Sequence, residues 1–89
     1  MRARLRGKYW ELVRAKNLEA RGDIDSPTTK NKRIRVNSKV EDATLELLEV
    51  VIHECLHGLV WDLSEETVQE SAVDLAKTLY KLGARIQLK

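Results

Sequence analysis

Apolar and polar residues alternate in two short segments of the first half of the chain. Residues 8–16 alternate loosely, which predicts a β-strand, with a short helix as the alternative. Residues 32–37 alternate charged with β-branched side chains, which predicts a short, half-exposed edge strand. Residues 21–32 contain Gly, Asp, Ser-Pro and Asn and almost no apolar residue, so we expect a loop there. Residues 1–7 are interpreted as a frayed basic arm.

The second half of the chain has the period of amphipathic helices. Residues 41–61 predict a first helix, with Asp42 or Ser38 as its N-cap. A second helix is expected to begin after Ser64, a favourable N-cap, and to stop at Gly83, followed by a short basic tail. The residues expected to be buried are Leu45, Leu48, Ile52, Leu56 and Leu59 in the first helix and Val68, Ala72, Leu75, Leu79 and Leu82 in the second.

Together these elements predict an α+β fold, with a small antiparallel or mixed sheet packed on two antiparallel helices. The chain has 89 residues, which suits one domain near the lower size at which a core forms without disulfides. Its content of 43% hydrophobic and 34% charged residues is that of a globular protein. We divide residues 1–89 into the basic arm, a strand and loop half over 8–40, and a helical half over 41–89.

Charge is distributed unevenly along the chain. Residues 1–40 hold 12 Lys and Arg against 4 Asp and Glu, a net of +8, whereas residues 41–89 hold 4 against 10, a net of −6. Basic clusters attract phosphates, but this one lies in no recognisable nucleic-acid-binding motif. We therefore interpret the basic half as a solvated surface that complements the acidic helices, and expect no nucleic-acid partner.

The cellular setting is predicted from cysteine and from apolar runs. The single Cys55 cannot form an internal disulfide, which suits a reducing compartment. No apolar stretch is long enough to cross a membrane, and no apolar segment of a signal peptide follows the basic N-terminus. We expect a cytoplasmic protein without a membrane partner.

Both histidines of the chain belong to the HExxH sequence His53-Glu54-Cys55-Leu56-His57. On a helix, positions i and i+4 lie about 40° apart, so both imidazoles can reach one metal ion. Glu54 lies beside them, where its carboxylate can take a proton from the attacking water. Cys55 projects about 200° from His53, so we expect it to pack as a small apolar residue rather than to bind the metal. The pattern predicts a Zn²⁺ site with Glu54 as the catalytic residue.

A hydrolytic zinc site usually has three protein ligands, and no further histidine remains. We expect a carboxylate from the second helix, which at equal rise comes level with the motif near Glu70. Glu66, one turn earlier, is the alternative ligand. Asp74, one turn later, is expected to accept a hydrogen bond from an imidazole. Glu70 nevertheless projects about 160° from the centre of the expected buried stripe.

HECLH followed by Glu70-Ser-Ala-Val-Asp74 resembles the gluzincin branch of the zincin metallopeptidases, to which thermolysin belongs. Residues 32–87 are also similar to small phage-encoded proteins regarded as zincin-like peptidases, whose setting would be the host cytoplasm. The resemblance implies an edge strand beside the cleft that pairs with an extended substrate, a role that matches residues 34–37. It implies zinc ligation by His53, His57 and Glu70, general-base catalysis by Glu54 and an imidazole contact by Asp74.

The function expected from these residues is zinc-dependent hydrolysis of peptide bonds, with a peptide or protein as substrate. Tyr80, Tyr9 and Arg35 are the candidates for stabilising the oxyanion. One alternative is a catalytically silent, zinc-stabilised module that binds a host protein or nucleic acid. Another is a hydrolase that cleaves a different amide, such as a cell-wall peptide bond. A further alternative is a homo-oligomer in which a second copy completes a shallow cleft.

Overall fold

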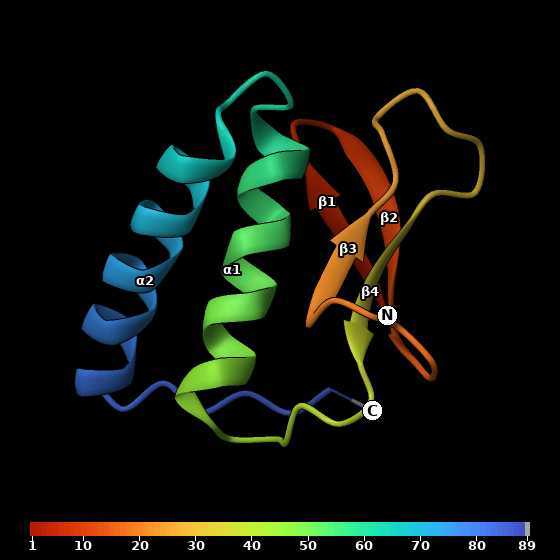
Figure 1. The fold of residues 1–89 in the computed structure, drawn as a ribbon. Helices are drawn as coiled ribbons and strands as arrows, with labels where there is room; N and C mark the ends of the chain where they lie inside the picture. Colours follow the sequence, from red (N-terminus) through yellow and green to blue (C-terminus); the bar gives the residue numbers. More distant parts are fainter. Residues whose placement is uncertain (89) are drawn as a thin grey trace.

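The protein folds into an α+β structure in which a four-stranded mixed sheet and two helices form three layers (Figure 1). This confirms the predicted fold class. The structure is a computed structural model that describes residues 1–88. Its elements are β1 (Arg2–Leu5), β2 (Lys8–Ala15), β3 (Gly22–Ile24), β4 (Arg33–Asn37), α1 (Leu45–Leu59) and α2 (Glu65–Lys81). No helix in this part of the chain is long and apolar enough to cross a membrane.

The N-terminal segment is the first correction, because it forms a strand and not a frayed arm. β1 pairs antiparallel with β2, and the hairpin is closed by Arg6 and Gly7. Both turn residues have positive φ, 51° and 81°, as the tight turn of a two-residue hairpin requires. The sequence signal was weak because Arg, unlike Asn or Asp, is not a typical first residue of such a turn.

The remaining strand order also differs from the prediction. The sheet has the order β1-β2-β4-β3, with β4 parallel to β2 and antiparallel to β3. β4 is therefore an interior strand, and the edge position belongs to β3, within the segment predicted to be a loop. Two hydrogen bonds flank β3, from the Asp25 amide to the Arg33 carbonyl at 3.0 Å and from the Asn37 amide to the Arg21 carbonyl at 2.8 Å. A three-residue strand containing Gly and Asp has no alternation from which to predict it.

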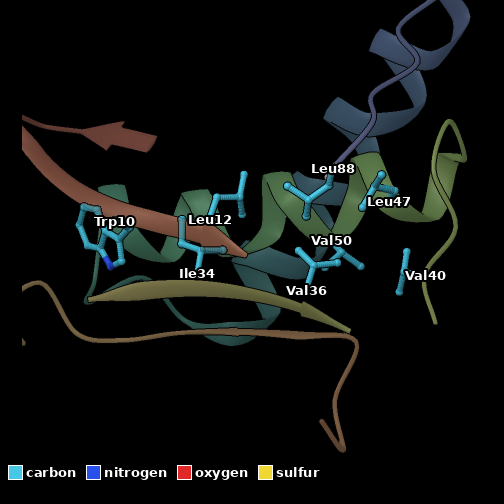
Figure 2. Close-up of a cluster of buried hydrophobic side chains, with 8 residues drawn as sticks. All are labelled: Trp10, Leu12, Ile34, Val36, Val40, Leu47, Val50 and Leu88. Carbon is cyan, nitrogen blue, oxygen red and sulfur yellow. The ribbon is translucent and has the colours of Figure 1, made fainter. Parts of the chain in front are cut away.

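The two faces of the sheet differ in polarity, as the alternation in β2 and β4 predicts. Trp10 and Leu12 from β2 and Ile34 and Val36 from β4 are buried beneath α1. The Trp10 indole N–H donates to the Asp25 carbonyl at 3.0 Å, so its one polar atom is satisfied. Figure 2 shows how side chains from the sheet, α1 and the C-terminal segment interlock in one core. Its members are Trp10, Leu12, Ile34, Val36, Val40, Leu47, Val50 and Leu88.

α1 begins later than predicted, at Leu45. Its N-cap is Thr44, whose hydroxyl oxygen accepts the Leu47 amide at 3.1 Å. Asp42, the predicted cap, instead accepts the Leu88 amide at 2.9 Å. Ser38, the other predicted cap, lies at the end of β4. The first turn of α1 is thus displaced because Asp42 is used in a tertiary contact.

α1 lies between the sheet and α2, so it is covered on two opposite sides (Figure 1). The residues turned toward the sheet include Leu47, Val50 and Gly58, which are buried. The predicted stripe lies about 150° away on the helix, where α2 packs. Of that stripe only Leu48 is buried, and Leu45, Ile52, Leu56 and Leu59 are half-buried.

α2 has the predicted ends but a narrower buried face. The Ser64 hydroxyl caps it by accepting the Thr67 amide at 3.2 Å, and Gly83 follows its C-cap with a φ of 100°. Among the helices and strands of residues 1–88, α2 packs only on α1. Its buried residues are Val68, Ala72 and Ala76, whereas Leu75, Leu79 and Leu82 are 46%, 39% and 79% exposed. One packing partner covers one stripe of small side chains, which leaves the predicted leucine stripe uncovered.

The C-terminal segment is not a free tail, because residues 84–88 return beneath α1 to the sheet (Figure 1). Arg14 holds this segment: its Nε donates to the Leu88 carbonyl at 2.9 Å, and Nη1 also donates to the Val40 carbonyl. Nη2 pairs with Asp42 at 2.6 Å. One guanidinium thereby joins β2, the segment before α1 and the C-terminus.

Replacing Arg14 by Leu should lower the free energy of unfolding by about 2 kcal/mol, because it leaves carbonyls and Asp42 without their charged donor. Urea denaturation measures the change. Arg4→Leu is the matched control, since Arg4 is exposed on β1 and forms no salt bridge within residues 1–88. Equal destabilisation by the two substitutions would contradict the role assigned to Arg14.

Candidate metal centre

His53 and His57 lie one turn apart on α1, as the HExxH spacing predicts. Their ring centroids are 4.9 Å apart in an edge-to-face arrangement. The side chains are 12% and 17% exposed, so both border a solvent-accessible space rather than fill the core. Both direct Nε2 to the same place, which is the geometry required for two ligands of one ion.

Glu65 completes the group. Its two carboxylate oxygens lie 2.8 Å from Nε2 of His53 and 2.9 Å from Nε2 of His57. One ligand atom from each of these three residues lies within 4.8 Å of the others. Two imidazole nitrogens and one carboxylate oxygen form a donor set that suits Zn²⁺ and leaves a fourth position open. The donor chemistry therefore fits the metal predicted from the sequence.

The structure places Glu65, and not Glu70, at the imidazoles. Glu65 is the first residue of α2 and projects within about 20° of the centre of the face that buries Val68 and Ala72. That face is turned toward α1. Glu70 projects about 160° away from it and is exposed. Equal rise per residue along the two helices predicts which residues of α2 lie level with the motif. It does not predict the rotation of α2 about its own axis, and this rotation decides which carboxylate faces the histidines.

Glu66 and Asp74 also lie outside the site. Both side chains are exposed on α2. The Asp74 main-chain carbonyl accepts a bond from the Thr78 hydroxyl, and its carboxylate makes no hydrogen bond to an imidazole within residues 1–88. The alternative ligand and the expected imidazole partner are therefore both remote from His53 and His57.

Glu54 is the buried carboxylate of the site, with 7% exposure. Burial, together with the nearby carboxylates of Glu65 and Asp23, raises the pKa of this carboxyl from 4.5 to about 7, while Arg21 opposes the shift. Gly22 of β3 allows this close packing: a Cβ there would lie 2.8 Å from a Val50 methyl and 3.3 Å from Oε2 of Glu54. The Glu54 carboxylate is thus confined between α1 and the edge strand.

A cleft of about 480 Å³ opens over these groups. The motif and Glu65 form one wall, β3 forms another, and the α1–α2 connection forms the rim. The lining residues are Gly22, Asp23, Ile24, His53, Glu54, His57, Trp61, Leu63 and Glu65. The two histidines, Glu54, Glu65 and the edge of the sheet therefore face one space.

The three candidates for stabilising an oxyanion do not line this cleft. Arg35 is bound to Asp23 and Asp25 at 3.0 Å. Tyr80 lies under the Arg85 guanidinium and Tyr9 under that of Arg2. Each aromatic ring is therefore engaged on the surface outside the cleft.

Two further residues of the site were missed in the sequence. Arg21 lines an adjoining hollow of about 170 Å³ with His53, Glu54 and Glu65, and its guanidinium pairs with Glu49 at 3.0 Å. Glu65 could have been found by its position, since it precedes buried Val68 by three residues on a helix capped by Ser64. Arg21 carries no such signal, because it precedes a strand that has no recognisable pattern.

Cys55 lies where the sequence predicts, away from the ligand group. It is half-buried and packs against the hydrophobic core. Burial raises the pKa of its thiol, so the neutral form is favoured. It behaves as a small apolar residue.

The raised pKa of Glu54 predicts a pH-dependent cost to stability in protein freed of metal by a chelator. Below pH 4.5 the carboxyl is protonated in both folded and unfolded states; between pH 4.5 and 7 only the folded state retains the proton, so stability falls as pH rises. Glu54→Gln should therefore stabilise the protein by about 2 kcal/mol at pH 8 and leave it unchanged near pH 4. Thermal denaturation across this range measures the difference, and a gain independent of pH would contradict the assigned cause.

Comparison with known proteins finds no match: no family model, no curated protein and no solved structure matches this chain. The interpretation of the site depends on the geometry of its side chains.

Proposed function

We propose that this protein is a zinc-dependent metallopeptidase in which His53, His57 and Glu65 hold the ion and Glu54 is the general base. One observation carries the proposal. A single cleft contains two imidazole nitrogens and a carboxylate oxygen that are close enough to one another to bind one ion. A second carboxylate is buried beside them. A hydrolytic zinc site needs the same division of roles, three ligands and a separate base.

The two carboxylates are suited to different tasks by their surroundings. Glu65 is 71% exposed and presents both oxygens to the histidines, which suits a ligand. Glu54 is held in a nearly dry position, where a carboxylate can accept a proton from water and pass it to the leaving nitrogen near neutral pH. Bound Zn²⁺ would supply polarisation of the scissile carbonyl and acidification of water.

β3 supplies a place for an extended substrate. In an antiparallel pair, bonded and non-bonded residues alternate, and the bonds at Arg21 and Asp25 leave Gly22 and Ile24 unbonded to β4. Their amide and carbonyl groups point to the free edge, beside Glu54. A peptide can pair with this edge by strand addition. The substrate strand expected at residues 34–37 is thus reassigned to β3.

Measured zinc affinity should distinguish the three ligand residues from the general base. His53→Ala, His57→Ala and Glu65→Gln should each weaken zinc affinity by roughly 100-fold or more, because each removes one of three ligands. Glu70→Gln is the matched control on the exposed side of α2 and should bind zinc like the parent. Titration with a chromophoric competitor measures all four variants. Equal zinc affinity of Glu65→Gln and the parent would refute the assigned ligand set.

Peptide hydrolysis tests the catalytic part of the proposal. Glu54→Gln should keep its zinc and lower kcat/KM on a quenched fluorescent peptide library by about 10² to 10⁴-fold, because the general base is lost. The parent protein with one equivalent of zinc and the chelated protein are the reference states. Zinc that raises the melting temperature with no cleavage of any peptide would favour the catalytically silent module. Cleavage that survives in Glu54→Gln would refute the mechanism.

A further inference from the structure

A second hollow lies outside the cleft, and part of its lining is on the sheet face turned away from α1. The pairing of β1 with β2 and of β2 with β4 places Arg2, Glu11 and Arg33 in one row across three strands. Tyr9 and Arg4 form the neighbouring pair on the same face. No helix among residues 1–88 covers this face. The strand spacing places the Cα atoms of the two arginines in the row roughly 10 Å apart.

The hollow extends from this face to Trp10, whose side chain packs toward α1. A cavity of about 540 Å³ is lined by Arg2, Tyr9, Trp10, Glu11, Asn31, Lys32 and Arg33. The Arg2 guanidinium lies 4.5 Å from the Tyr9 ring centroid, and the Lys32 ammonium lies 5.1 Å from that of Trp10. Tyr9 is 45% exposed, although it is a large aromatic residue on a strand. The hollow therefore combines cations with a partly exposed tyrosine ring, one face of which carries the Arg2 guanidinium.

The positive charge of the hollow is not neutralised by the residues that line it. Glu11, the one carboxylate in the lining, is bound to the N-terminal ammonium at 3.1 Å. Arg2, Lys32 and Arg33 form no salt bridge with any residue of the described chain, 1–88. Arg35, on the same face, shows the contrast, because Asp23 and Asp25 both pair with it. Three cations without a salt-bridge partner in the described chain thus line the hollow.

We propose that this hollow binds single-stranded nucleic acid, with Arg2, Lys32 and Arg33 on phosphates and Tyr9 as a platform for one base. An acidic protein would use the cations alone. The exposed aromatic ring is explained by a ligand that alternates anionic groups with flat rings, since any base can stack on it. The sequence showed basic residues without a motif, and the fold brings three of them to the hollow that Tyr9 also lines.

The region is separate from the metal centre. The hollow and the cleft share no lining residue, and they involve different strands, since the cleft involves β3 and the hollow involves β1, β2 and the start of β4. Nucleic-acid binding therefore needs neither zinc nor Glu54. Oligonucleotide binding and peptide hydrolysis can therefore be lost independently of each other.

Fluorescence anisotropy with a labelled 12-nucleotide oligo-dT, on the full chain at 50 to 300 mM salt, tests the assignment. Three phosphate contacts predict that log K falls with log salt with a slope of about −2, and loss of one cation in Arg33→Gln or Lys32→Gln should reduce the slope by about 0.7. Tyr9→Leu should weaken binding about tenfold and leave the slope unchanged, because stacking releases no counterion. An oligo-dA of equal length should bind in the same hollow.

Matched controls come from the other end of the molecule. Tyr80→Leu removes the ring that Arg85 covers at 3.4 Å, and Lys77→Gln removes an exposed cation of α2. Neither should change oligonucleotide binding, and melting curves establish that all variants fold. Equal effects of Tyr9→Leu and Tyr80→Leu would overturn the proposal. So would competition by poly-glutamate as effective as that by unlabelled oligo-dT at matched charge, or no binding at 50 mM salt.

Discussion

α1 packs between the sheet and α2, and the other features of this small protein follow from that double contact. A helix covered on two opposite sides has little surface left for polar residues. On α1, such an uncovered strip faces β3 and the start of α2. His53 and His57 lie on this strip. The small residues of the packing faces, Gly58 on α1 and Ala72 and Ala76 on α2, let the layers approach closely.

The same arrangement separates the two carboxylates of the metal centre. Glu54 points between α1 and β3, where burial disfavours its charged form. Glu65 enters from the first turn of α2 and stays in contact with solvent. Under the proposed function, this difference in burial suits Glu54 to proton transfer and Glu65 to metal ligation, although both residues are glutamates of the same cleft.

Charge is organised by layer as well as by chain segment. The sheet, built from the basic half of the sequence, has an outer face without a helix, and its cations gather there around Tyr9. The acidic half forms the helices and supplies Glu54 and Glu65 to the cleft, whereas the third carboxylate of the lining, Asp23, comes from β3. Arg14 and Arg21 are exceptions that join the halves, since Arg14 binds Asp42 and Arg21 binds Glu49. The +8 and −6 halves therefore attract each other at a few contacts and keep opposite outer surfaces.

The elements with a clear period were predictable. Strands β2 and β4, the two helices, the Ser64 cap and the α+β class are all present, because their patterns depend on neighbouring residues. β1 and β3 were not predicted, since the Arg6-Gly7 turn is atypical and a three-residue strand has no period. The buried stripe of α1 was only partly correct, because a helix with two partners has no single apolar face.

The sequence by itself determined the arrangement of His53, Glu54 and His57, since residues within one helical turn have a geometry set by the backbone alone. Tertiary structure decided the rest of the centre. Whether Glu65 or Glu70 meets the histidines depends on how α2 is rotated against α1. Rotation is set by which small side chains pack between the helices, and the edge strand beside Glu54 is set by long-range pairing that no local pattern reveals.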